Sequence, residues 1–227
     1  MKTPAEEICL RADALYETRA DIANVRESAR LLQGALSDRD DYELNWRLGR
    51  ALFFLGQQAD DKDEARSAHL EGADACRKAV RTAPGGVEGQ FWLGVNLALL
   101  AQLERRMPAM LQARRAKRAL GRAVAIDPLY HGAGPVRVLA RLHHKLPRLL
   151  GGGVVRAREN YERAITLAPE NTVTRLYFAE LLFDIGETDR AREELEAVLN
   201  APLDPAWAFE IERDRRIAKE MIETRGQ

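Results

Sequence analysis

The sequence predicts an all-α fold, an α-α superhelix of about eleven helices arranged as repeated helical hairpins, without a β-sheet. Four segments share one ending, an alanine five residues before a proline: ACRKAVRTAP, ALGRAVAIDP, NYERAITLAP and ELEAVLNAP. Two hydrophobic segments carry near-copies of one phrase, WRLGRAL and FWLGVNL. No segment alternates apolar and polar residues between turn signals, as a half-buried strand would. These observations indicate a row of similar helical units.

The N-terminal unit, residues 1–40, is predicted to be a degenerate copy of the repeat. Its two helices are expected near Pro4–Thr18 and Ile22–Leu36. Asp40 stands where the later units place their closing proline, so this unit departs from the pattern at its end.

The next two units, residues 41–84 and 85–128, each contain a glycine in the middle of the hydrophobic helix. Gly49 and Gly94 are 94 − 49 = 45 residues apart. A glycine inside a helix lowers helix stability by up to about 1 kcal/mol. Its recurrence at one place in the repeat therefore predicts a close approach between helices at that point.

Two further units are predicted for residues 129–169 and 170–202. Their hydrophobic helices, VLARLHH and YFAELLF, place Ala140 and Ala179 where the glycines stood. Proline ends each second helix, because it cannot extend the helix and disfavours helical geometry in the residue before it. The closing prolines are Pro84, Pro128, Pro169 and Pro202.

Residues 203–227 are predicted to form a C-terminal helix that covers the exposed end of the repeats. Asp204 is expected to cap this helix, and Pro205 suits its first turn. The helix carries a partly apolar stripe that would face the last hairpin: Ala208, Ile211, Ile217, Met221 and Ile222.

The composition of the 227 residues is that of a folded protein, with 46% hydrophobic and 31% charged residues. Lys and Arg together number 35, as do Asp and Glu, so no net charge would hold the chain on a nucleic acid or on an anionic membrane. No apolar run is long enough for a transmembrane segment. The N-terminus shows no secretory leader, which predicts a cytoplasmic protein as written, or a periplasmic one if a leader had been trimmed.

The stretch HGAGPVRVLARLHHKLPRLLGGG, His131–Gly153, is the most unusual part of the chain. Its first half is predicted to be a helix with Pro135 near its start, and its second half an inserted turn. His143 and His144 are adjacent, so on a helix they point about 100° apart and suit one metal ion poorly. The histidines are therefore expected to pack or to cap, and no catalytic residue, metal site or cofactor is predicted.

The basic run QARRAKRALGR, Gln112–Arg122, allows two interpretations. Its cations are spaced around a helix whose alanines and leucines face inward, which is typical of a solvated outer face. The alternative is a surface for an acidic partner.

The hairpin pattern resembles the tetratricopeptide repeat, in which one helix carries an aromatic residue and Leu-Gly and the next ends at proline. The closing prolines here are spaced by 128 − 84 = 44, 169 − 128 = 41 and 202 − 169 = 33 residues. The family's unit is about 34 residues. The resemblance therefore implies a single tetratricopeptide-like domain over residues 1–227, with insertions in two units that lengthen the paired helices or their turns.

The order of motifs from Leu15 to Trp207 resembles a more specific family, TatT, the T-component associated with tripartite ATP-independent periplasmic (TRAP) transporters. The most distinctive positions are Gly134, Pro135, Arg137, Lys145, Pro147 and Gly151–Gly153. The resemblance implies that His131–Gly153 is a family-specific turn and pore-side helix.

The same resemblance implies a non-enzymatic scaffold that associates with a periplasmic solute-binding protein in solute uptake. It also implies a trimer with a central pore, and a lipoprotein anchored to the membrane. The sequence departs from the family in having neither a leader nor a lipidation motif. A cytosolic adaptor that binds proteins and has no transporter is the alternative, and a small-molecule ligand or a homo-oligomer is compatible with either function.

Candidate contact residues come from the first helix of each pair, which lines the concave surface of a tetratricopeptide superhelix. Aromatic residues beside arginines are the usual components of interaction hot spots. The alternative for Trp46, Phe91 and Tyr177 is that they pack between repeats. The candidates are Trp46, Arg50, Phe54, Phe91, Val95, Arg137, Arg141, His144, Tyr177 and Glu180.

Overall fold

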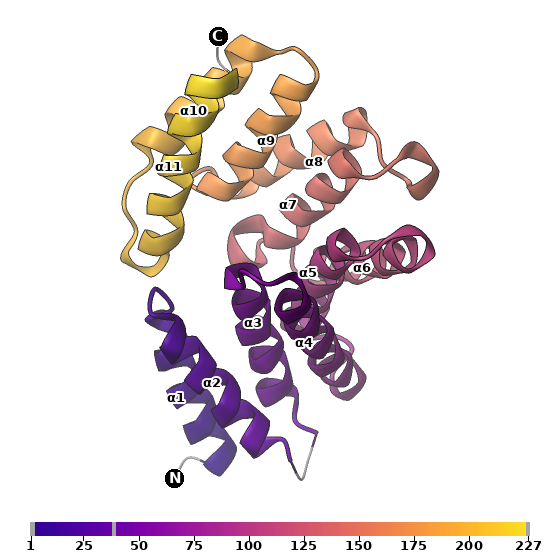
Figure 1. The fold of residues 1–227 in the computed structure, drawn as a ribbon, viewed down its shortest axis with the longest axis vertical. Coiled ribbons are helices and arrows are strands. Elements are labelled where there is room, and N and C mark those ends of the chain that lie inside the picture. The colour runs from indigo at the N-terminus through magenta and orange to yellow at the C-terminus, as the bar shows by residue number, and fades with distance from the viewer. Residues whose placement is uncertain (1–2, 38–39, 226–227) are drawn as a thin grey trace. The chain divides into compact units, whose positions relative to one another are not determined.

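The computed structural model describes residues 3–37 and 40–225, and within them the chain is helical without a strand (Figure 1). The all-α fold of about eleven helices is confirmed. The α-helices are α1 (Pro4–Glu17), α2 (Ile22–Ala35), α3 (Tyr42–Gln58), α4 (Lys62–Thr82), α5 (Val87–Leu103), α6 (Arg106–Ile126), α7 (Tyr130–Lys145), α8 (Val154–Leu167), α9 (Thr172–Asp184), α10 (Thr188–Asn200) and α11 (Ala208–Arg225). Two short 3-10 helices, η1 (Arg148–Leu150) and η2 (Pro205–Trp207), lie between them.

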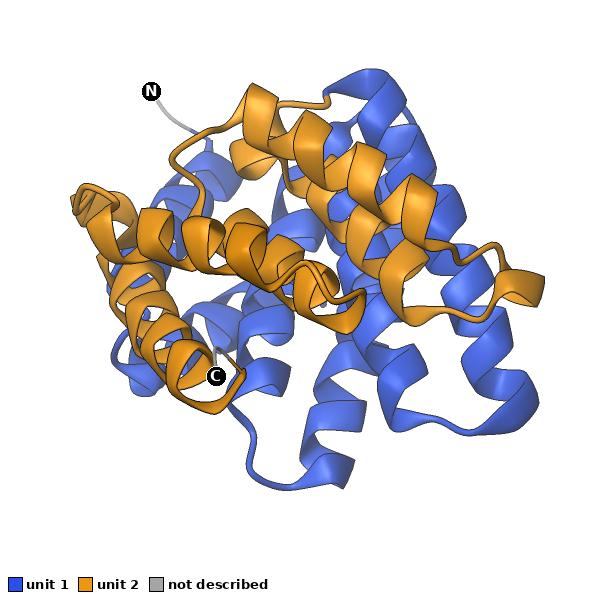
Figure 2. Cartoon of the chain, turned by 90° about the horizontal axis from the view of Figure 1, so that it is seen from above, with its two compact units in different colours: residues 1–127 blue, residues 128–227 orange. Residues whose placement is uncertain are grey.

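The helices pack as consecutive hairpins, α1 with α2, α3 with α4, α5 with α6, α7 with α8 and α9 with α10. The chain divides into two compact units, unit 1 of residues 1–127 and unit 2 of residues 128–227 (Figure 2). The prediction of one domain divided at residues 40, 84, 128, 169 and 202 stays a prediction, and its outermost residues, 1–2 and 226–227, lie outside the described part of the chain.

The closing prolines determine where the second helix of each hairpin ends. The second helices α4, α6, α8 and α10 all end two residues before one of these prolines, as expected from the restriction that proline places on the residue before it. α4 and α6 each have 21 residues, against 14 for α8 and 13 for α10. The longer repeat spacing in residues 41–128 is thus accommodated by longer helices.

The mid-helix glycines of unit 1 lie where two helices meet. A Cβ on Gly94 of α5 would lie 2.5 Å from Cγ of Leu120 on α6. A Cβ on Gly49 of α3 would lie 2.1 Å from Sγ of Cys76 on α4. Both distances are below van der Waals contact, so only glycine allows these helices to pack this closely.

A buried polar bridge joins three helices of unit 1. Asn96 on α5 is fully buried, and its Nδ2 donates to the Gly49 carbonyl oxygen on α3 (3.0 Å) and to the Trp92 carbonyl oxygen (2.9 Å). Its Oδ1 lies 3.2 Å from Nδ1 of His69 on α4. Asn96 therefore fixes the register of α3, α4 and α5, because a shift of any one would leave a buried polar group without its partner.

Because His69 is buried, we expect unit 1 to lose stability in mild acid. Burial lowers the pKa of His69 below the ordinary value of 6.5, although the hydrogen bond with Asn96 opposes this shift. As pH falls below 6.5, His69 binds a proton in the unfolded chain before it does so in the folded chain. The free energy of unfolding therefore decreases as pH falls from 6.5 toward the lower pKa that His69 has in the folded protein. Urea midpoints should therefore fall more in the wild type than in His69→Gln between about pH 7.5 and about pH 5.5. Equal falls would show that His69 carries no such stability.

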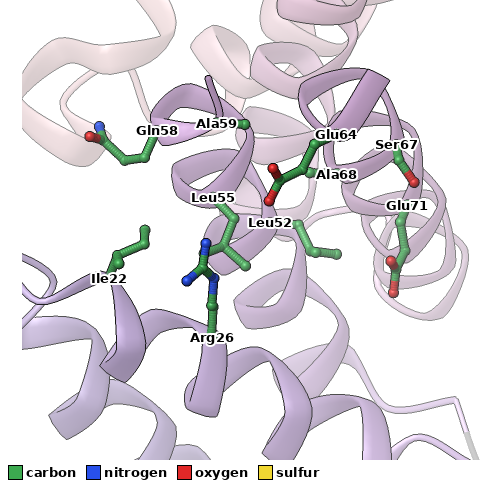
Figure 3. Close-up of a pocket in the computed structure, with 10 residues that line it drawn as sticks. All are labelled: Ile22, Arg26, Leu52, Leu55, Gln58, Ala59, Glu64, Ser67, Ala68 and Glu71. Atoms are coloured by element: carbon green, nitrogen blue, oxygen red, sulfur yellow. The ribbon is translucent and has the colours of Figure 1, made fainter. Parts of the chain in front are cut away.

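Unit 1 also contains two shallow cavities. The first has a volume of about 200 Å³ and is lined from α2, α3 and α4, with Ile22, Arg26, Leu55, Glu64 and Glu71 among its lining residues (Figure 3). The second, of about 260 Å³, lies beside the loop between α3 and α4, and His69 is one of its lining residues. Both mix aliphatic and charged walls.

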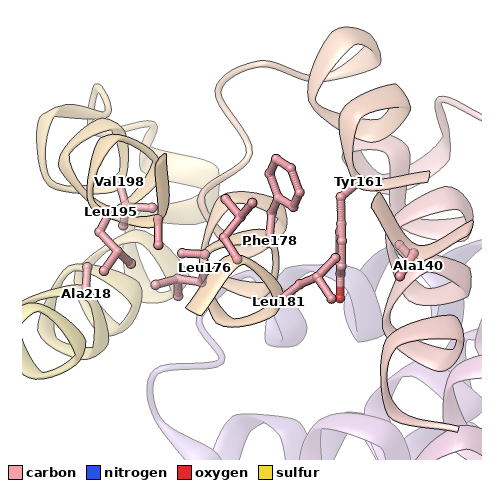
Figure 4. Close-up of a cluster of buried hydrophobic side chains, with 12 residues drawn as sticks. Ala140, Tyr161, Leu176, Phe178, Leu181, Leu195, Val198 and Ala218 are labelled. Atoms are coloured by element: carbon pink, nitrogen blue, oxygen red, sulfur yellow. The ribbon is translucent and has the colours of Figure 1, made fainter. Parts of the chain in front are cut away.

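An apolar cluster between α8, α9, α10 and α11 stabilises unit 2 (Figure 4). Tyr161 of α8 and Phe178 of α9 are fully buried, with ring centroids 5.6 Å apart. Ala140 of α7 adds to the cluster on one side and Ala218 of α11 on the other. α11 contacts both α9 and α10 and so packs against the last hairpin.

The predicted apolar stripe of α11 is wrong at Ile217. Ile217 is 38% exposed, whereas Ile211, Asp214 and Ala218 are buried. The buried line follows steps of three and four residues from Ile211, which leaves Ile217 outside it. Asp214 is tolerated there because it accepts hydrogen bonds from Thr172 Oγ1 (2.6 Å) and Arg213 Nη2 (2.7 Å). Burial nevertheless raises the pKa of its carboxyl group.

Candidate functional site

The predicted contact residues lie on the first helices of the hairpins, α3 and α5 in unit 1 and α7 and α9 in unit 2. In unit 1 they lie beside α1, which contacts α3, and α3 in turn contacts α5. In unit 2, α7 contacts α9 and α9 contacts α11. Within each unit, this surface is called the first-helix face below.

The first-helix face of unit 1 carries an Asp13 cluster, defined as Asp13, Tyr16, Trp46, Arg47 and Arg50. Asp13 accepts from Arg47 Nε at 2.9 Å and from Arg50 Nη2 at 2.5 Å. The Arg50 guanidinium lies 4.1 Å from the Tyr16 ring centroid and 5.1 Å from that of Trp46. Arg47 lies 4.2 Å from the Trp46 ring centroid. One carboxylate and two aromatic rings thus hold two guanidinium groups in place.

The side chains of the Asp13 cluster are held in place in the unbound protein. The side chains of Arg47 and Arg50 are only 14% and 15% exposed. Burial by itself lowers the pKa of Arg47, but hydrogen bonds to Glu43 and the charge of Asp13 outweigh it and raise that pKa. Trp46 is 8% exposed and donates from Nε1 to Glu43 (3.0 Å). Most of the entropy of fixing these long side chains is therefore lost on folding, before a partner binds.

Three other candidates of unit 1 are placed in its core. Phe54, Phe91 and Val95 are 4%, 2% and 7% exposed. The Phe54 ring meets Tyr16 edge to face at 6.0 Å, and the Phe91 ring meets Trp92 at 4.8 Å. Their described contacts are packing contacts, and their part in binding stays a prediction.

The first-helix face of unit 2 carries a Glu180 cluster, defined as Arg141, Lys145, Tyr177 and Glu180. Glu180 of α9 forms ion pairs with both Arg141 and Lys145 of α7. The Arg141 guanidinium lies 4.4 Å from the Tyr177 ring centroid. Burial alone raises the pKa of Glu180, but Lys145 and Arg141 outweigh it and lower that pKa. Arg141, Tyr177 and Glu180, which sequence reasoning selected separately, are thus brought together.

His144 belongs to a neighbouring group centred on Asp184. Its Nε2 lies 2.9 Å from Asp184 Oδ2, and Arg225 Nη2 donates to Asp184 Oδ1 at 2.6 Å. Burial raises the pKa of Asp184, yet hydrogen bonds from Arg225 and His144 prevail and hold it at about 2. Burial lowers the pKa of His144 despite this carboxylate. His144 therefore tethers α7 to the end of α9.

Arg137 stabilises the start of α7, and its part in binding a partner stays a prediction. It is 6% exposed, and its Nη1 donates to the Gly132 carbonyl oxygen (2.8 Å) and to Asn171 Oδ1 (3.2 Å). His131, Gly132 and Ala133 form a left-handed turn with φ of 53°, 60° and 57°. Burial lowers the pKa of Arg137. Two donated hydrogen bonds thus stabilise a turn that non-glycine residues rarely adopt.

A reactive site in the described residues would need metal ligands or a nucleophile. No three His, Cys, Asp or Glu side chains of these residues gather as metal ligands. Cys9 and Cys76 are buried thiols whose pKa values are raised by burial, which makes them poor nucleophiles. What the first-helix faces offer is a set of prearranged guanidinium, carboxylate and aromatic groups, which suits recognition of another molecule.

Sequence reasoning did not select Asp13, Tyr16 and Arg47, and it singled out Lys145 only as part of the family motif, not as a contact residue. Asp13 and Tyr16 lie in the degenerate first unit, where no repeat motif marks them, and the hydrogen bonds of Asp13 with α3 span 34 and 37 residues. Arg47 and Lys145 are neighbours in sequence of the selected Trp46 and His144. Including the residue adjacent to each selected position would have found these two.

Comparison with known proteins supports the tetratricopeptide-like architecture. A crystal structure of a thermophilic TPR protein of Thermus thermophilus superposes with a TM-score of 0.68 at 20% sequence identity, covering 95% of this chain and 98% of that one. At that identity the likeness concerns the fold alone. Protein crooked neck of Drosophila melanogaster is 33% identical over 116 residues, which are 50% of this chain but only 14% of that protein.

No helix among the described residues is long and apolar enough to cross a membrane. The family of the TRAP transporter T-component matches residues 48–224, from the middle of α3 to the last turn of α11. This range includes the left-handed turn, both helices of the Glu180 cluster and the C-terminal helix α11. The chain therefore belongs to the TRAP transporter T-component family, TatT.

Proposed function

We propose that this protein is a non-enzymatic scaffold that associates with a TRAP-type periplasmic solute-binding protein in solute uptake. Its membership of the T-component family and its tetratricopeptide-like fold, both non-catalytic kinds, support a helical-repeat scaffold that binds protein. The observation that carries the proposal is the pair of prearranged clusters on the first-helix faces, around Asp13 and around Glu180.

Each cluster has the composition of an interaction hot spot. Arg50 and Arg141 lie over aromatic rings and are neutralised by a carboxylate, so a partner need not remove an isolated charge from water. Their side chains are partly exposed, 15% for Arg50 and 26% for Arg141, which leaves an edge of each guanidinium for a partner's acceptors. Clusters of this kind supply most of the binding energy in many interfaces.

Association with a periplasmic solute-binding protein requires a periplasmic location. Fractionation of cells that express the native gene tests this, with the solute-binding protein as the periplasmic marker. Recovery with that marker supports the proposal. Recovery with cytosolic proteins alone would contradict it and favour the second candidate, a cytosolic adaptor. The trimer with a central pore and a small-molecule ligand stay predictions.

Arg141→Ala is expected to weaken binding of the solute-binding protein about tenfold or more, since truncating a hot-spot arginine typically lowers affinity by about 2 kcal/mol. The measurement is affinity capture from cells that express the protein at native level, with quantification of the captured solute-binding protein. Arg192→Ala is the matched control, because Arg192 forms only a surface ion pair with Asp189 at 3.6 Å. Equal recovery with both variants would show that the Glu180 cluster does not contribute.

A further inference from the structure

The outer surface of α6 carries a basic stripe that the proposed function does not use. Between Glu104 and Asp127 the sequence has no acidic residue. The same segment holds seven cations, Arg105, Arg106, Arg114, Arg115, Lys117, Arg118 and Arg122. In a chain with 35 cations and 35 anions, this concentration is a local feature and not a consequence of net charge.

The stripe runs along one side of the helix. Met107, Leu111, Arg114, Arg118 and Arg122 follow one another at steps of three or four residues, which places them in line. All five are exposed. The opposite side of α6, with Ala113, Ala116, Ala119, Leu120 and Ala123, is buried. These first five residues are called the α6 stripe, and they span about 22 Å at the α-helical rise.

The arginines of the α6 stripe differ from those of the first-helix faces. Arg47, Arg50 and Arg141 form ion pairs with carboxylates. Within the described residues, Arg114, Arg118 and Arg122 have no such ion pair. Their positive charge is therefore available to an outside anion.

Two large apolar side chains lie at the N-terminal end of the same stripe. Met107 is 71% exposed and Leu111 is 48% exposed. A helix that lies on a bilayer combines exposed apolar side chains, which enter the boundary between headgroups and acyl chains, with arginines that bind lipid phosphates. The exposed side of a helix is convex, which suits a broad anionic plane better than an extended peptide, since a peptide needs a groove.

We propose that the α6 stripe docks the protein peripherally on an anionic lipid bilayer. Met107 and Leu111 enter the interface, and Arg114, Arg118 and Arg122 bind lipid phosphate groups. This contact is separate from the first-helix faces, so it leaves the Asp13 and Glu180 clusters available to a protein partner.

The test is co-sedimentation of the full chain with vesicles of phosphatidylcholine containing about 30% phosphatidylglycerol, at low ionic strength. The wild type is expected to bind these vesicles, to bind pure phosphatidylcholine vesicles far less, and to release as salt rises. The triple variant Arg114→Glu, Arg118→Glu, Arg122→Glu should lower the partition coefficient about a hundredfold.

A second triple variant controls for net charge. Arg156, Arg163 and Arg216 are exposed arginines of unit 2, and changing all three to Glu alters the net charge by the same amount. This control should bind like the wild type, while Met107→Ser with Leu111→Ser should bind less at every salt concentration. Circular dichroism confirms that each variant is folded. Absence of wild-type binding, or equal losses in both triple variants, would overturn the proposal, and the stripe would then be a solvated surface or a site for an acidic protein.

Discussion

Gly94→Leu is expected to lower the free energy of unfolding by about 2 kcal/mol or more. A Cβ at this position would lie 2.5 Å from Cγ and 2.9 Å from Cδ2 of Leu120, and 3.3 Å from the Leu120 backbone nitrogen. A leucine side chain would add further atoms to the same space, so α5 and α6 would have to separate. Urea unfolding monitored by circular dichroism measures the change.

Gly121→Leu is the matched control, with the opposite expected sign. Gly121 lies inside α6, is exposed, and would bring a Cβ within 4 Å of nothing. Replacing a helix-interior glycine there should stabilise the protein by up to about 1 kcal/mol. Equal unfolding midpoints for Gly94→Leu and the wild type would show that α5 and α6 do not approach as closely as described.

Asn96→Ala is expected to cost about 2 to 3 kcal/mol, because it removes buried hydrogen bonds and leaves a space in the core. His69 would lose the 3.2 Å contact between its Nδ1 and Asn96 Oδ1, and the Gly49 carbonyl oxygen would lose the donor at 3.0 Å. The measurement is the urea midpoint together with the slope of the unfolding transition.

Asn24→Ala serves as the comparison for this variant. Asn24 donates from Nδ2 to Thr18 Oγ1 at 2.9 Å in an exposed setting, so its removal should change stability by less than about 0.5 kcal/mol. A loss in Asn96→Ala no larger than that in Asn24→Ala would contradict the bridge between α3, α4 and α5.

The helices and their ends could be predicted from sequence because their causes are local. Each closing proline restricts the residue before it, and α4, α6, α8 and α10 all end two residues earlier. The glycines Gly49 and Gly94 also indicated close packing, since a mid-helix glycine needs a reason. Signals of this kind act within one or two turns of helix.

The clusters of the site could be predicted only in part, because they depend on how successive hairpins stack. Helical phase placed Arg50, Arg141 and Tyr177 on the first-helix faces, but the pairing of Arg50 with Asp13 joins residues 37 apart in the chain. Helical phase also selected Phe54 and Phe91, which are buried in the core. Aromatic residues on the first-helix face and aromatic residues in the core have the same spacing along a helix, so phase does not separate them. The left-handed turn at His131–Ala133 has only a weak local signal, since Gly132 and His131 are residue types that tolerate positive φ whereas Ala133 is not.

The central claim is that the first-helix faces bind a TRAP-type solute-binding protein. Isothermal titration calorimetry of the purified full chain against the purified solute-binding protein of the same organism tests it most directly, with Arg50→Ala and Arg141→Ala as variants. The account predicts saturable binding by the wild type. It predicts that each variant binds with an affinity lower by about tenfold or more. Absence of binding between two folded proteins, or binding that neither variant weakens, would contradict it.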